Sequence, residues 1–253
     1  KTDKAFDNIN RKFTLHLSGT PFKAIASSKF RPEQIFNWSY EDEQEAKANW
    51  PAEQGTNPYE KLPRLNMFTY QLSNMIRDTL AKGLDLSEDE HAEYAFDLNE
   101  FFRVDKGRFV YEKDVERFLA ALTTNEKFPF STPELRRELR HTFWLRSRVD
   151  SVKAMAKLLK RHPVFEQYEV VIAAGDGKLD ATDDTENKKS YDKVLDAIVH
   201  HDRTITLSVG QLTTGVTVKP WTAVFILSNM KSPAEYMQAA FRAQNPYEYT
   251  EDG

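Results

Sequence analysis

Hydrophobic positions in the second half of the chain fall into short apolar runs separated by longer amphipathic stretches. The apolar runs are predicted strands and the stretches between them are predicted helices. The strands are His141–Leu145, Tyr168–Ala174, Arg203–Val209 and Thr222–Leu227, and the helices are Ser151–Arg161, Lys188–His200 and Pro233–Ala243. Strands that are apolar throughout and are separated by helices are typical of a parallel sheet covered on both faces. We therefore expect an α/β fold.

The first 140 residues are less regular. Lys12–Leu17 and Leu65–Leu72 are predicted strands, and the polar, proline-punctuated stretch from Phe22 to Leu62 suits a connecting segment. Residues 74–140 show the apolar spacing of helices, and the aromatic spacing within residues 97–119 indicates core packing.

Local signals refine two further segments. Ser131 and Thr132 are suited to cap a helix that begins at Pro133. The acidic stretch Asp180–Lys189 is predicted to be an exposed loop.

Composition excludes several classes of protein. The chain has 253 residues, of which 40% are hydrophobic, and no cysteine, so it has no disulfide, cysteine-ligated metal site or thiol nucleophile. The sequence has no apolar run as long as a membrane span and no signal-peptide pattern, which leads us to expect a cytoplasmic protein without a membrane partner. The chain begins with Lys1 inside a polar, helix-like stretch, and we interpret it as a piece of a longer protein.

A net charge of −4 argues against a surface that is basic overall. Three local basic clusters stand out, and each alone is interpreted as a solvated helix face: Arg136–Arg140, Arg146–Arg148 and Lys157–Arg161.

Four polar or glycine-bearing segments follow predicted strands: Ser18–Pro21, Arg146–Arg148, Gly175–Gly177 and Gly210–Gly215. In an open parallel sheet, ligands gather beyond the carboxyl ends of the strands. A hydroxyl-rich turn there can hold phosphate oxygens, and Arg242 on the following helix can meet developing negative charge.

The succession LSGTPF, FWLRSRVDSVKAMAKLL, TITLSVGQLTTGVTV and EYMQAAFRAQNP resembles motifs III to VI of superfamily 2 helicases and translocases, especially restriction-enzyme motor subunits. In those families two RecA-like lobes sandwich ATP, and the second lobe presents an arginine finger. The resemblance implies a RecA-like parallel sheet with helices on both faces and a helical insertion at about 74–140. It divides the chain into the end of the first lobe (1–22), a linker (23–61), the second lobe (62–247) and the start of a following segment (248–253).

The resemblance also implies roles for individual residues. Those expected to act in catalysis are Arg242 and Gln238. Those expected to contact ATP are Gly215, Thr217 and Gln244. The motif III residues expected to couple the lobes are Ser18, Gly19 and Thr20. Those expected to contact nucleic acid are Arg146, Ser147, Arg148, Thr213 and Thr214. No metal ligand is assigned.

The chain departs from the family pattern in ways that limit these roles. It contains no G-x-x-x-x-G-K-[ST] sequence, and Asp89-Glu90-His91-Ala92 resembles a DEAH box but lies downstream of motif III. Phe241 and Asn245 replace a glycine and an arginine of motif VI, so Arg242 is the only candidate finger on its helix face. We therefore expect ATP and Mg²⁺ to bind only in the complete protein, with none bound by this piece alone.

The partners implied are DNA, the first lobe of the same polypeptide, and methyltransferase or specificity subunits. Other interpretations stay open. Arg242 could form a salt bridge with Glu235 or Glu248, and Thr213 and Thr214 could simply form a turn. His200-His201 is interpreted as a helix C-terminus rather than a metal site. The whole chain could be a non-catalytic nucleic-acid- or protein-binding module; a nucleotide-sugar transferase would need a glycine-rich loop that is missing.

Overall fold

The structure is a computed structural model that describes residues 10, 12–27, 30–70, 97–174 and 184–250. The chain divides into two compact units, residues 1–37 and residues 38–253.

The described part of the first unit contains the short helix α2 (Phe22–Ala26) and the 3₁₀ turn η1 (Pro32–Gln34). The strand predicted over Lys12–Leu17 is wrong for this structure, since these residues form no strand. Phe13, Leu15 and Leu17 are 87%, 78% and 85% exposed. The alternating pattern is that of a strand, but a strand needs a neighbour to pair with, and the described residues of this unit supply none.

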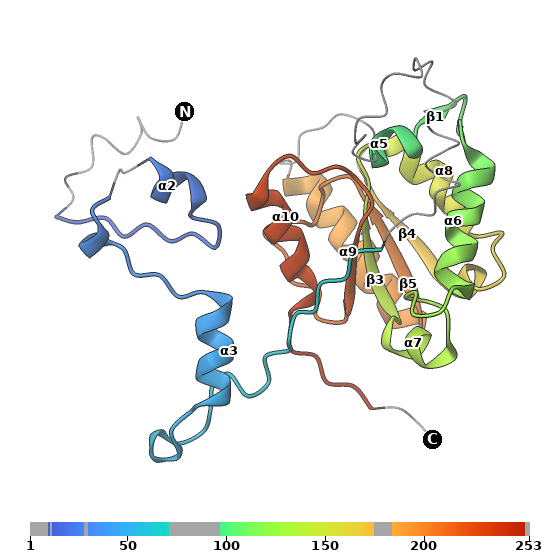
Figure 1. The fold of residues 1–253 in the computed structure, drawn as a ribbon. Coiled ribbons are helices and arrows are strands. Elements are labelled where there is room, and N and C mark those ends of the chain that lie inside the picture. Colours follow the sequence, from blue (N-terminus) through green and yellow to red (C-terminus); the bar gives the residue numbers. More distant parts are fainter. Residues whose placement is uncertain (1–9, 11, 28–29, 71–96, 175–183, 251–253) are drawn as a thin grey trace, which may run out of the picture. The chain divides into compact units, whose positions relative to one another are not determined.

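The second unit is built on a four-stranded sheet of β3 (His141–Leu145), β4 (Glu169–Ala173), β5 (Thr204–Ser208) and β6 (Ala223–Ile226). The strand order is β4-β5-β3-β6, and every neighbouring pair is parallel (Figure 1). All four predicted strands are confirmed, with ends shifted by at most a residue or two. They could be recognised because strands covered by helices are short runs rich in apolar and β-branched residues.

Helices cover both faces of this sheet. The helices α6 (Glu112–Thr124) and α8 (Val149–Leu159) lie on one side, and α9 (Asp184–His200) and α10 (Pro233–Ala240) on the other (Figure 1). Alternate residues of β3 supply the two cores: Trp144 packs with the α6 and α8 side, whereas Phe143 packs with the α9 and α10 side and stacks on Trp221 at 4.4 Å. The predicted RecA-like α/β fold class is confirmed at the level of this architecture.

The predicted helical insertion is only partly helical. Within its described residues lie α5 (Leu98–Phe101), α6, and α7 (Pro133–Glu138), but a hairpin of β1 (Val104–Asp105) and β2 (Arg108–Phe109) separates α5 from α6. Lys106 and Gly107 form its turn with φ of 47° and 77°, the left-handed pair that a two-residue hairpin favours. Residues 74–96 lie outside the described part.

Two details of the insertion match the sequence analysis. Thr132 caps α7, because its hydroxyl accepts a hydrogen bond from Leu135 N. The aromatic residues of the 97–119 segment are core residues as predicted: Phe101, Phe102, Phe109 and Phe118 are buried.

Three other segments differ from expectation. The stretch predicted as a connector contains α3 (Tyr40–Ala48), capped by Ser39, and the turn η2 (Ala52–Gln54). Residues 65–70 form no strand, and Met67 and Phe68 are exposed; residues 71 and 72 lie outside the described part. The helix predicted from Lys188 begins earlier, since residues 184–187, predicted to be loop, already belong to α9.

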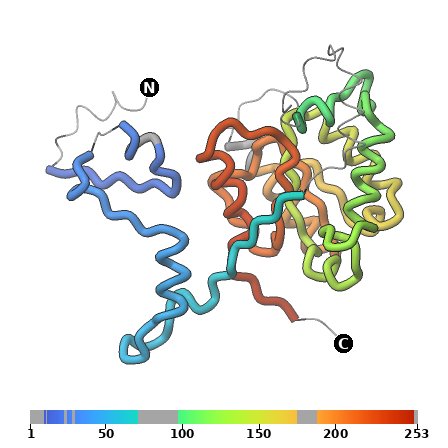
Figure 2. Tube along the Cα trace, in the orientation of Figure 1, coloured from blue at the N-terminus to red at the C-terminus, as the bar shows by residue number. Residues whose placement is uncertain are grey.

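Beyond these elements lie the 3₁₀ turns η3 (Phe165–Gln167) and η4 (Phe241–Ala243). The segment after η4 returns to the residues before the insertion, where Lys61 Nζ lies 2.8 Å from Glu248 Oε1 (Figure 2). Among the described residues no helix is both long enough and apolar enough to cross a membrane.

The buried His141 at the start of β3 is expected to make the stability of the fold depend on pH. His141 is buried, its Nδ1 lies 3.0 Å from Thr204 Oγ1, and burial, helped by Arg140, lowers its pKa to about 4. The unfolded chain, with an ordinary pKa of 6.5, binds this proton first, so the free energy of unfolding falls as pH drops from about 6.5 to about 4. Allowing for solvent screening, we expect His141 to contribute about 2 kcal/mol of this loss.

Urea denaturation of wild type and His141→Gln across this pH range measures the effect. The variant is expected to lose less stability on acidification than wild type. Parallel curves for the two proteins would contradict the buried neutral imidazole.

Candidate functional site

The carboxyl ends of the strands meet at one edge of the sheet. Leu145 of β3 is in register with Ser208 of β5 and with Ile226 of β6, and Ala173 of β4 is in register with Ser208. The segments that follow these strands therefore emerge together, as expected for a ligand-binding edge.

The glycine- and threonine-rich loop after β5 is held by its own polar groups. Ser208 Oγ donates to Gln211 O (2.6 Å), and Thr213 Oγ1 donates to Gly210 O (2.6 Å). The hydroxyl of Ser190 on α9 donates to Gln211 Oε1 at 2.8 Å. These contacts fix the loop against the start of α9.

Gly215 lies in the left-handed region with φ of +72°. A Cβ at this position would meet no atom within 4 Å, so the backbone conformation, rather than crowding, favours glycine. The open space beside it leaves the loop accessible at this point.

Arg242 joins the helix after β6 to this loop. Its Nη1 donates to Val216 O, and its Nε donates to Gln238 O at 3.1 Å. The guanidinium is half-buried, and burial lowers its pKa. The structure thus brings Arg242, Gln238 and the backbone between Gly215 and Thr217 into one cluster.

The salt bridge considered for Arg242 does not form among the described residues, where Glu248 pairs with Lys61 instead. Asn245 Nδ2 donates to Arg242 O at 2.9 Å and so fixes the end of η4. Gln244, which follows η4, has a buried Nε2 that makes no hydrogen bond within the described part of the chain. The same holds for single side-chain atoms of Gln44, Tyr168, Thr206 and Trp221, so this feature is not confined to the cluster around Arg242.

Arg146 lies in the interior, although it was predicted to contact nucleic acid. It is 3% exposed, and its guanidinium lies 3.7 Å from the ring centroid of Phe102. Nε donates to Ser151 Oγ (2.9 Å) and Nη1 donates to Leu227 O. Burial lowers its pKa to about 9. This geometry gives Arg146 a structural role and leaves its guanidinium no open path to a polyanion.

The other residues predicted to contact nucleic acid are accessible. Arg148 is exposed at the start of α8 and pairs with Asp150 at 3.2 Å, Ser147 is half-buried, and Thr214 is exposed. Thr213 is half-buried and occupied by its bond within the turn. Ser147, Arg148 and Thr214 therefore remain predictions that the geometry permits.

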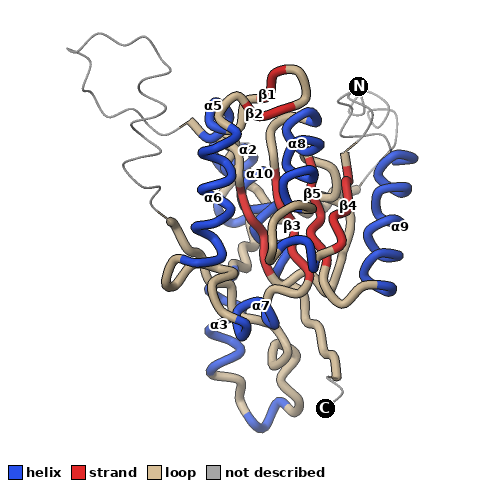
Figure 3. Tube along the Cα trace, turned by 90° about the vertical axis from the view of Figure 1, so that its right-hand side faces the viewer, coloured by secondary structure: helices blue, strands red, loops and turns tan. Residues whose placement is uncertain are grey.

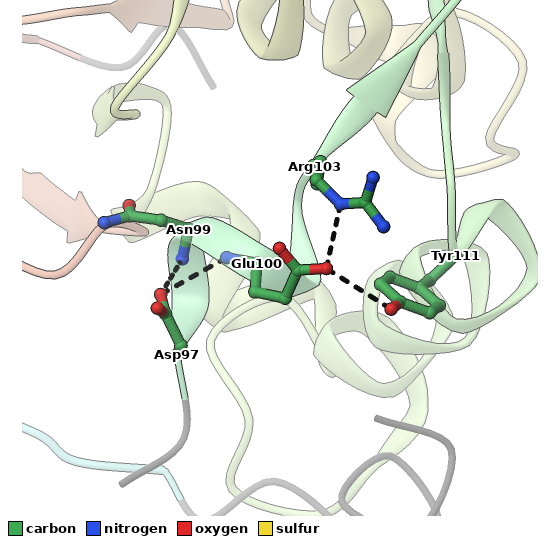
Figure 4. Close-up of polar contacts among 5 residues, drawn as sticks. All are labelled: Asp97, Asn99, Glu100, Arg103 and Tyr111. Carbon is green, nitrogen blue, oxygen red and sulfur yellow. Dashed lines mark hydrogen bonds and ion pairs between the residues drawn. The ribbon is translucent and has the colours of Figure 1, made fainter. Parts of the chain in front are cut away.

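The start of the insertion contributes polar groups that the sequence analysis missed. Asn229, just beyond β6, donates from Nδ2 to Asp97 Oδ1 at 3.2 Å and accepts from Leu98 N at 3.3 Å. Asp97 also caps α5 by accepting from Asn99 N and Glu100 N (Figure 4). An aspartate three residues before a glutamate was the available signal for this cap.

Helix α5 also forms hydrogen bonds with residues that follow it in the insertion. Glu100 Oε1 accepts from Arg103 Nε at 2.8 Å and from the Tyr111 hydroxyl at 3.3 Å (Figure 4). The insertion is thereby attached to the carboxyl edge of the sheet through α5.

Several predicted residues are not placed with this cluster. Ser18, Gly19 and Thr20 belong to the first unit, where Thr20 N donates to Ser18 Oγ at 3.2 Å. Gly175–Gly177 and Asp89–Ala92 lie outside the described residues.

His200 closes α9 as interpreted from the sequence, since its Nδ1 lies 2.8 Å from Asp196 O. Within the described ranges, no three acidic or histidine side chains gather as ligands for a metal ion.

Comparison with known proteins gives one relative. The chain is 31% identical over 252 residues to a Mycoplasma pneumoniae protein described as "Putative type II restriction enzyme and methyltransferase RM.MpnORF110P C-terminus". The alignment covers 91% of this chain and 34% of that protein, so the chain spans about a third of the relative's length. No family model and no solved structure matches the chain. The similarity relates the chain to a protein of restriction-modification description and does not by itself reveal a motor.

Removal of the buried Arg146 guanidinium is expected to cause a large loss of stability. Arg146→Ala leaves Leu227 O and Ser151 Oγ without their donor and opens space beside Phe102, and we expect it to lower the free energy of unfolding by about 3 kcal/mol. The exposed Arg148→Ala is the matched control and is expected to change it by less than about 0.5 kcal/mol. Chemical denaturation of both variants measures the difference, and equal stabilities would show that Arg146 is not structural.

Proposed function

We propose that this chain contributes the second motor lobe of an ATP-dependent DNA translocase or helicase in a restriction-modification system. The observation that carries the proposal is the contact of Arg242 with Val216 O, because it unites the segments that resemble motifs V and VI at one edge of a parallel sheet. The restriction-modification description of the relative supports the biological setting.

The chemistry of such a lobe is mainly positioning. When ATP and Mg²⁺ are bound by the complete protein, phosphoryl transfer to water spreads negative charge over the γ-phosphate oxygens. Arg242 would stabilise this charge from the side of the second lobe, and Gln238 and Gln244 would supply amide hydrogen bonds to phosphate, water or the opposite lobe. Gly215 and Thr217 would line the same gap with backbone and hydroxyl groups.

The chain offers no lysine-bearing phosphate loop, since it has no G-x-x-x-x-G-K-[ST] sequence. We therefore expect the phosphates and the metal to be held by a first lobe, with this chain alone inactive. Ser147, Arg148 and Thr214 would contact the phosphate backbone of DNA from the same edge.

One observation favours a second candidate function. Both hydrogen bonds that the Arg242 guanidinium donates within the described residues go to carbonyl groups of the same unit, which is also how a purely structural arginine behaves. A non-catalytic nucleic-acid- or protein-binding module with a RecA-like fold would keep these contacts without using the arginine in hydrolysis.

Substitution of Arg242 in a polypeptide that carries both lobes distinguishes the motor from the binding module. Arg242→Ala is expected to lower kcat for DNA-stimulated ATP hydrolysis by about 10³-fold while ATP binding is retained, because an arginine finger acts on the transition state. Arg242→Lys should recover little of this loss, since a lysine lacks the planar guanidinium fork.

The matched control is Arg137→Ala, which removes an exposed arginine of α7 near the amino ends of the strands. It should hydrolyse ATP at the wild-type rate. Wild-type turnover in Arg242→Ala, with an unchanged melting temperature, would exclude the finger and favour the binding module.

A further inference from the structure

A basic surface lies on the outer side of the insertion and of α8. Two of its side chains come from the β1–β2 hairpin, two from α8 and one from the residue that caps the end of α8. Its members, called here the basic face, are Lys106, Arg108, Lys153, Lys157 and Lys160. All five are exposed.

The packing of α8 explains why its lysines share one side. The helix buries Val152, Met155 and Leu159 against the core, so that residues 153, 157 and 160 form a stripe on the solvent side. At 1.5 Å per residue the stripe extends over about 10 Å of helix axis.

The hairpin extends this stripe. Both of its strands pack on α8, and a Cβ built on Gly107 would lie 3.9 Å from Lys157 Nζ. Figure 3 shows the hairpin beside one end of α8. The turn residues Lys106 and Gly107 thus bring the hairpin's charges beside those of the helix.

One exposed carboxylate lies among these charges, because Asp105 is the cross-strand partner of Arg108 in the β1–β2 hairpin. Nearby arginines do have partners: Arg103 pairs with Glu100, Arg148 with Asp150, and Arg161 with Glu112. Within the described part of the chain, none of the five members of the basic face forms an ion pair. Five cations beside one carboxylate give this surface a local excess of positive charge in a chain whose net charge is −4.

We propose that the basic face binds the phosphate backbone of double-stranded DNA. The proposal rests on the proposed function for its choice of DNA among polyanions, and it extends the DNA contact from the carboxyl edge along the outside of α8. Lysines act as point charges toward phosphates, which B-DNA presents about every 3.4 Å along each strand.

The composition of the surface favours a duplex over a single strand. Single-stranded nucleic acid is held by exposed aromatic side chains on which bases stack. The large hydrophobic side chains exposed in the described ranges include none from α8 and only Val110 near the hairpin. The aromatic residues of the hairpin region, Phe102 and Phe109, are buried.

The test compares two triple substitutions in the 253-residue chain. Lys153→Gln/Lys157→Gln/Lys160→Gln removes three charges of the basic face. Lys188→Gln/Lys189→Gln/Lys193→Gln removes three exposed charges from α9, on the opposite face of the sheet, and is the matched control. Binding of a fluorescein-labelled DNA duplex of about 20 base pairs is followed by anisotropy from about 50 to about 200 mM KCl.

The α8 variant is expected to bind at least about 10-fold more weakly at low salt, and its slope of log K against log salt should fall by about 2 to 3, since each phosphate contact contributes about 0.9. The α9 control should keep the wild-type slope. Lys106→Gln/Arg108→Gln should lower the slope by about 1 to 2. Circular dichroism checks that all variants are folded.

Equal slopes for the α8 and α9 variants, or no duplex binding by the folded wild type, would overturn the proposal. Tighter α8-dependent binding of duplex RNA than of duplex DNA would overturn the assignment to DNA. Neither result depends on Arg242, so the basic face can fail while the motor proposal stands, and loss of the motor proposal in the ATPase test leaves these slopes unchanged.

Discussion

The buried guanidinium of Arg146 joins the elements that meet at the carboxyl edge of the sheet. It follows β3, donates to a carbonyl beyond β6 and to the hydroxyl of Ser151 on α8, and lies against Phe102 at the end of α5. A cation enclosed in this way is tolerated only when its donors are satisfied, so the four elements must keep their relative positions. The elements from which the loops of this edge emerge are therefore held in fixed relative positions.

The insertion packs on this part of the fold. Its described residues share one hydrophobic core with α8 and with one face of the sheet, and Asn229 ties α5 to the loop after β6. The insertion is thus part of the same folded body as the parallel sheet. On the other face, α9 and α10 pack against the loop after β5, which Arg242 contacts through Val216 O.

The sequence predicts the sheet well because its strands are rich in apolar and β-branched residues, and all five residues of β3 and of β5 are buried. Lys12–Leu17 has a clear strand pattern, but alternation alone cannot supply the neighbour that a strand needs. The hairpin was missed because its strands have two residues each, and Gly107 was its only local signal. The burial of Arg146 was hidden in a run of charged residues, since the partners that enclose it come from Phe102 and Leu227, distant in sequence.

The most direct test of the central claim is DNA-stimulated ATP hydrolysis by the purified 253-residue chain, measured beside a polypeptide that also carries a first lobe with a phosphate-binding lysine. A second lobe is expected to show no turnover alone, whereas the longer polypeptide should hydrolyse ATP in a DNA-dependent manner. Robust hydrolysis by the chain alone, or none in the longer polypeptide, would contradict the assignment of this chain as the second lobe of a motor.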